Sequence, residues 1–140
     1  MDGNLNRELV IIGGGPAGLM AAESALANGA SNVSVYERMG SVARKFLIAG
    51  KGGLNLTHSE PMPQFIQRYL PQTRSIGHWL REFGPDAVRA WASGLGVETF
   101  VGSSGRVFPH DLKAAPLLRA WVRRLRANGV RFHVNHEWLG

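Results

Sequence analysis

The chain has 140 residues, of which 44% are apolar and 19% are charged, a composition typical of one folded domain. The absence of cysteine excludes disulfides, thiolate metal sites and cysteine redox chemistry within these residues. The formal net charge is +6, and the excess lies in residues 61–140, where eleven Lys and Arg face five Asp and Glu. No apolar stretch has the length of a membrane span or the features of a signal peptide, so we expect a soluble, cytoplasmic domain without a membrane partner.

The first part of the chain predicts a strand, a helix and a second strand. Glu8–Ile12 is a nearly continuous apolar run, which is typical of a strand buried on both faces. Residues 16–28 are rich in alanine, begin with proline and are followed by Gly29, so they predict a helix. Asn32–Glu37 alternates in polarity and predicts the second strand. This order indicates two parallel strands joined by a crossover helix, and therefore an α/β fold.

The rest of the chain predicts four helices, a hairpin and one more strand. The helices are expected over Pro63–Leu70, Ser75–Phe83, Pro85–Leu95 and Ala114–Ala127. The strands are expected over Glu98–Val101, Arg106–Phe108 and Val130–Val134, the first two as a hairpin around Gly-Ser-Ser-Gly. We therefore divide the chain into a βαβ unit with a glycine-rich loop (1–60), a helical and hairpin insertion (61–108), and a helix and strand that return to the first sheet (109–140). The last strand leaves an open sheet edge, so we expect an amino-terminal fragment of a larger protein.

A glycine motif follows the first predicted strand. It has the pattern G-x-G-x-x-G and consists of Gly13, Gly14, Gly15, Pro16, Ala17 and Gly18. In this context the first glycine permits a tight turn, the second lets a pyrophosphate approach the backbone, and the third allows close packing of helix and sheet. Glu37 ends the next strand and can accept hydrogen bonds from a ribose diol, with Arg38 beside it. The motif therefore predicts a site for an adenine dinucleotide.

A second cluster of glycines begins soon after the second strand. The segment reads Arg44-Lys-Phe-Leu-Ile-Ala-Gly-Lys-Gly-Gly-Leu-Asn-Leu-Thr-His58 and predicts a glycine loop that approaches a second part of an extended ligand. An NAD domain usually continues into another helix and strand at this point, so the loop favours FAD over NAD.

Three segments together resemble a known family. "VIIGGGPAGLMAAESALANGASNVSVYE", "RKFLIAGKGGLNLTH" and "GRVFP" are similar to the bacterial BaiN-like (YhiN-type) family of flavoproteins. The resemblance implies a glutathione-reductase-type FAD domain, with NAD(P)H as a transient electron donor and a small-molecule substrate. It also implies that Arg44 and Lys45 lie near the phosphates. It places five further residues on the flavin side, namely Gly50, Gly52, Gly53, Asn55 and Leu56.

The sequence favours an FAD-binding oxidoreductase that transfers hydride from a nicotinamide donor to an electron-poor substrate. Many members of the family have G-G-G-R-C-N in the second loop, whereas this chain has Lys51 and Gly53-Leu54 there, so chemistry that depends on that Arg or Cys is in doubt. Two alternatives stay open: an NAD-binding module of a dehydrogenase, and a non-catalytic or RNA-associated flavoprotein fragment whose basic helix (Arg119, Arg123, Arg126) is the working surface. The residue pattern identifies no catalytic acid or base, no metal site and no oligomeric state.

Overall fold

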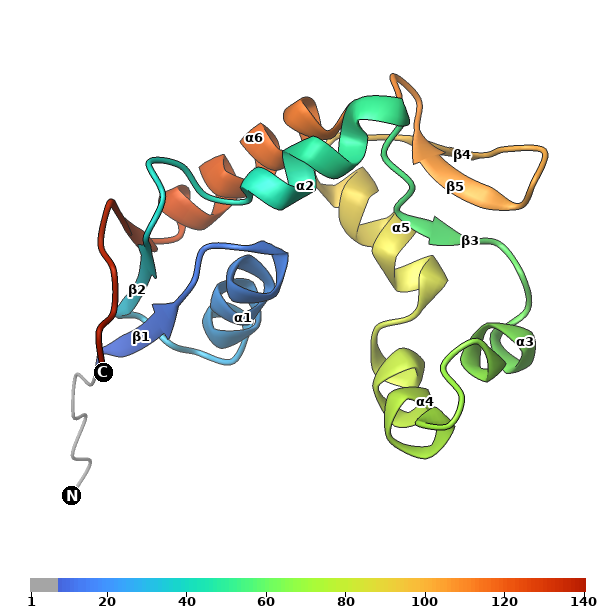
Figure 1. The fold of residues 1–140 in the computed structure, drawn as a ribbon, viewed down its shortest axis with the longest axis horizontal. Helices are drawn as coiled ribbons and strands as arrows, with labels where there is room; N and C mark the ends of the chain where they lie inside the picture. The colour runs from blue at the N-terminus through green and yellow to red at the C-terminus, as the bar shows by residue number, and fades with distance from the viewer. Residues whose placement is uncertain (1–7) are drawn as a thin grey trace. The chain divides into compact units, whose positions relative to one another are not determined.

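The computed structural model describes residues 8–140 (Figure 1). This part of the chain divides into two compact units. The first consists of residues 8–48 and 118–140, and the second of residues 49–117. Residues 57–58 belong to the second unit, where they pair with one of its strands. The boundaries expected at 60/61 and 108/109 stay a prediction.

The first unit is built on a parallel sheet. Its strands are β1 (Leu9–Ile12), β2 (Val33–Glu37) and β6 (Arg131–Val134), in the order β1-β2-β6. Val35 lies at the centre of the sheet, where it pairs with Ile11 on one side and Phe132 on the other. The three predicted strands and the α/β parallel fold are therefore confirmed.

Two helices accompany this sheet, α1 (Pro16–Ala27) and α6 (Ala114–Ala127). Pro16 is the first residue of α1. Proline suits this position because the first N–H groups of a helix have no acceptor within the helix, so the lack of one costs no hydrogen bond. The helix predicted over Ala114–Ala127 is confirmed as α6, and its residues Leu118, Trp121 and Leu125 are buried. Trp121 Nε1 donates a 2.5 Å hydrogen bond to Glu23 Oε2, which joins α6 to α1.

The prediction that the first strand is buried on both faces is wrong for the described residues. Leu9, Val10 and Ile12 are 42%, 46% and 53% exposed. The reason is that Val10 and Ile12 border a hollow to which no helix contributes, and that β1 pairs only with β2 within residues 8–140. Burial on both faces needs covering layers on both sides of the sheet.

The second unit contains an antiparallel sheet in the order β3-β5-β4. Its strands are β3 (Thr57–His58), β4 (Thr99–Val101) and β5 (Arg106–Pro109), and the helices of the unit are α3 (Met62–Gln67), α4 (Thr73–Glu82) and α5 (Pro85–Gly94). The predicted hairpin of β4 and β5 and the three helices are confirmed. Strand β3 was not predicted, because two residues are too few to show alternation and their partner β5 lies far along the chain.

The segment predicted as one glycine loop contains helical turns. Arg44–Ala49 forms α2, and Gly50–Gly52 forms the short 3₁₀ helix η1. Arg-Lys-Phe-Leu-Ile-Ala contains good helix formers, whereas the glycines come only after it. The loop prediction is therefore corrected to a short helix followed by a glycine-rich turn.

Candidate functional site

The turn between β1 and α1 has the backbone that the glycine motif predicts. Gly13 has a φ of +99°, a left-handed conformation that glycine adopts without a steric penalty. Its N–H donates to the carbonyl oxygen of Tyr36 at 2.8 Å, so this hydrogen bond ties the start of the turn to strand β2. A Cβ on Gly18 would lie 1.9 Å from the carbonyl oxygen of Gly13. Gly18 is therefore required for the close approach of α1 to the turn.

Gly15 faces open space, unlike Gly14 and Gly18 of the same motif. A Cβ built on Gly15 meets no atom within 4 Å, whereas a Cβ on Gly14 would lie 2.7 Å from Val42 Cγ1. Gly15 is also the N-cap of α1, and no side chain caps this helix end. The backbone N–H groups of a first helical turn, here those of Ala17 and Gly18, have no intrahelical carbonyl partners and carry partial positive charge. This end of α1 can therefore receive an anionic group through the backbone.

Glu37 holds the backbone of the site in place. Its Oε2 accepts a hydrogen bond from the N–H of Gly14 at 2.9 Å, and its Oε1 accepts one from the N–H of Met39 at 2.8 Å. A carboxylate has about four lone-pair positions, so two acceptor positions stay available for a ligand. The sequence predicted only a ligand role for Glu37, and the link to the glycine turn is a second role that motif reasoning missed.

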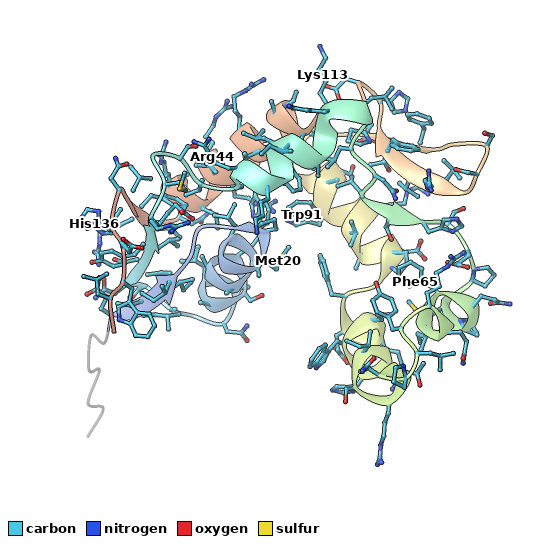
Figure 2. The ribbon with its side chains drawn as sticks, in the orientation of Figure 1. Met20, Arg44, Phe65, Trp91, Lys113 and His136 are labelled. Carbon is cyan, nitrogen blue, oxygen red and sulfur yellow. The ribbon has the colours of Figure 1, made fainter. Side chains whose placement is uncertain are left out.

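A hollow of about 260 Å³ lies at the carboxyl ends of the strands. Among its lining residues are Gly13, Glu37 and Arg38, which the sequence predicted, and also His136, Glu137 and Trp138, which it did not. The N–H of His136 donates to the carbonyl oxygen of Glu37 at 3.0 Å, so the segment after β6 lies against the end of β2. Figure 2 marks His136 on this segment. The available signal was the strand itself, because ligands of open α/β sheets bind beyond the carboxyl ends of strands.

The remaining predicted site residues lie on other elements. Arg44, marked in Figure 2, and Lys45 begin α2 in the first unit, and both are exposed. The five residues predicted on the flavin side belong to the second unit: Gly50 and Gly52 in η1, Gly53 directly after it, and Asn55 and Leu56 before β3. The structure thus brings residues 13–18, Glu37 and Arg38 together in one unit. Within residues 8–140, no group of three or more His, Cys, Asp or Glu could hold a metal ion, and no helix could cross a membrane.

A strand, a glycine turn, a helix and a second strand that ends in an acid define a Rossmann-type βαβ unit. Comparison with protein-family models agrees with this class, because the model described as "HI0933-like protein Rossmann domain" matches residues 7–140. The chain belongs to this family.

Two known proteins illustrate the relationship. The chain is 28% identical over 125 residues to a 3-dehydro-bile acid delta(4,6)-reductase of Clostridium scindens, a match that covers 88% of this chain and 30% of the reductase. It also superimposes on the crystal structure of Thermovibrio ammonificans THI4 with a TM-score of 0.53 and 20% identity, covering 91% of this chain and 38% of that one. The second likeness shows the fold alone. The chain therefore spans about a third of the length of each relative.

Proposed function

We propose that this chain binds the ADP half of FAD as part of a flavoprotein oxidoreductase. The observation that carries the proposal is the open space at Gly15, beside an uncapped helix end and within the same turn that Glu37 holds. A larger residue would fill this space, so the site suits a group that must approach the bare backbone closely. A pyrophosphate at a helix N-terminus is such a group.

Each part of the site has a task in this proposal. The backbone of Gly13–Gly18 binds the pyrophosphate, and the free acceptor positions of Glu37 bind the adenosine ribose. The hollow lined by Tyr36, His136 and Trp138 takes the adenine ring. FAD, when bound, supplies a flavin ring that accepts and donates hydride, while the protein positions it and excludes competing reactions.

Further parts of the proposed function rest on the family resemblance and on the relatives. The assignment of Gly50, Gly52, Gly53, Asn55 and Leu56 to the flavin half, and of Arg44 and Lys45 to the phosphates, stays a prediction from the family resemblance. Membership of the HI0933-like family and the similarity to a reductase support oxidoreductase chemistry. A nicotinamide donor and an electron-poor small-molecule substrate stay part of the proposal, as does a cytoplasmic location.

The test is flavin retention by the full chain and by Gly15→Val. We expect the purified protein to show the visible absorbance of flavin and to release FAD on denaturation. Gly15→Val should lose the flavin without a large loss of stability, because its side chain enters open space. Ala27→Val is the matched control, since it adds a β-branched side chain at the exposed far end of the same helix.

Three outcomes would contradict the proposal. A colourless protein that binds NAD would favour the dehydrogenase alternative. Full flavin retention by Gly15→Val would remove the pyrophosphate from this turn. Equal loss of flavin in Ala27→Val would show that any disturbance of α1 releases the cofactor.

A further inference from the structure

A separate groove lies in the first unit, on the side of the sheet that carries α6. Its volume is about 530 Å³, larger than that of the hollow at the strand ends. The apolar side chains that line it come from four segments: Val42 before α2, Leu47 of α2, Leu118 and Val122 of α6, and Phe132 and Val134 of β6. Helix α6 also contributes Arg119, Arg123 and Arg126, and no acidic side chain lines the groove.

The three arginines form one stripe along α6. Their spacing of four and then three residues places them on the same side of the helix, and all three are exposed. The guanidinium of Arg126 lies 5.5 Å from the centre of the Phe132 ring, a cation–π distance that holds it at the groove.

The other arginines of this part of the chain have different surroundings. Arg124 is paired with Glu23, and Arg131 is paired with Glu8. No ion pair is found for Arg119, Arg123 or Arg126 within the described residues 8–140. The groove therefore combines an apolar floor with positive charge that no carboxylate of the described chain neutralises.

We propose that this groove binds an amphipathic anion: a small molecule with an extended apolar body and one carboxylate or comparable anionic head. Its volume lies within the range of about 300–1,000 Å³ that is usual for small-molecule sites. The apolar body covers Val122, Leu118 and Val134, and the head pairs with the guanidinium groups at the rim, where a planar fork matches a carboxylate.

The apolar floor of the groove favours a small amphiphile over a nucleic acid as the ligand. Single-stranded nucleic acids need aromatic faces on which bases stack. The groove has one aromatic ring, Phe132, and Arg126 already lies over it. Aliphatic side chains form the rest of the floor, and these suit a hydrocarbon body.

The proposal does not depend on the proposed FAD site. None of Gly13, Gly15, Gly18 or Glu37 lines the groove. Variants of the rim arginines should therefore leave flavin retention unchanged, and this readout separates failure of one proposal from failure of the other.

The experiment is calorimetric titration of the full chain with sodium decanoate, octanoate and acetate at concentrations below micelle formation. We expect decanoate to bind about tenfold more tightly than octanoate, since two further methylene groups are buried, and acetate to show no binding. Decanol should bind more weakly than decanoate because it lacks the charge. In the double variant Arg119→Gln, Arg123→Gln, decanoate affinity should fall about tenfold, as expected for loss of charge-assisted hydrogen bonds.

Arg74→Gln is the matched control, because Arg74 is also an exposed helical arginine but lies on α4 of the second unit. Its decanoate affinity should equal that of the original chain. The proposal is overturned by equal affinity for decanoate and acetate, or by an equal loss in Arg74→Gln and the double variant. Loss of flavin from the double variant would also overturn the proposal. So would tighter binding of an oligonucleotide than of decanoate, if the double variant abolished the binding of the oligonucleotide.

Discussion

The two ends of the parallel sheet differ in the groups that form hydrogen bonds there. At the end where the strands begin, side chains bind one another: Arg131 Nη2 donates to Glu8 Oε1 at 2.8 Å and to Asn32 Oδ1 at 2.5 Å, and Ser34 Oγ donates to Glu8 Oε1 at 2.6 Å. At the end where the strands finish, the Glu37 carboxylate binds backbone N–H groups of the adjacent turns.

The difference separates a structural end from a functional one. Side chains that bind one another stabilise the starts of three strands and leave little for a ligand. A carboxylate that binds the backbone instead fixes the glycine turn while α1 keeps a helix end that no side chain caps. Polar groups that recognise a ligand are held in place, but their hydrogen-bonding positions are not all occupied by neighbouring side chains.

The largest expected effect distinguishes two glycines of the same turn. Gly18→Ala should destabilise the protein by about 3 kcal/mol or more, because its Cβ would overlap the carbonyl oxygen of Gly13. Gly15→Ala should cost no more than about 1 kcal/mol, since its Cβ meets nothing and only the N-cap preference is lost. Urea unfolding of both variants measures the difference. Equal losses would mean that the turn is not packed as described.

A smaller effect should show the structural role of Glu37. Glu37→Ala leaves the N–H groups of Gly14 and Met39 without their acceptor, so we expect a loss of about 1–3 kcal/mol even in protein stripped of cofactor. Glu37→Gln keeps one acceptor oxygen and should lose less. The measurement is urea unfolding of the stripped protein. If stability were unchanged in both, Glu37 would act on the ligand alone.

The smallest effect concerns the opposite end of the sheet and depends on pH. The hydrogen bond from Ser34, followed by that from Arg131, lowers the pKa of Glu8 below its ordinary value of 4.5. The lowered pKa contributes stability that is present above that ordinary value and is lost as the pH falls through the pKa of the folded state. Ser34→Ala should therefore lower the stability of the protein slightly near neutral pH, and the loss should be smaller in acid.

Unfolding midpoints of Ser34→Ala at about pH 7 and about pH 3 test this expectation, with flavin retention as the companion measurement. Retention should be unchanged, because Ser34 lies at the start of β2 and Glu37 at its end. A pH-independent difference in stability would contradict the role assigned to Glu8. Loss of flavin would contradict the separation of the two ends.

Much of the first unit could be predicted because its signals are local. The helix over Ala114–Ala127 was predicted with the same bounds as α6. Its leucines and Trp121 are spaced so that they fall on one side of a helix, and this side is buried. Strand β3 could not be predicted, because only its pairing with β5 makes Thr57 and His58 a strand. His136, Glu137 and Trp138 follow a predicted strand, which indicates the carboxyl end of the sheet. Only the tertiary structure shows that they line a hollow together with Glu37.

The amino-acid sequence by itself determined the glycine turn, its helix and the acid at the end of the second strand. Steric freedom at Gly13 and the apolar run before it are properties of neighbouring residues, so they can be read along the chain. Only the tertiary structure decided that Glu37 binds the backbone of Gly14, that β1 is an exposed edge, and that three arginines border an apolar groove. These features depend on which distant segments meet, and a local pattern does not record such contacts.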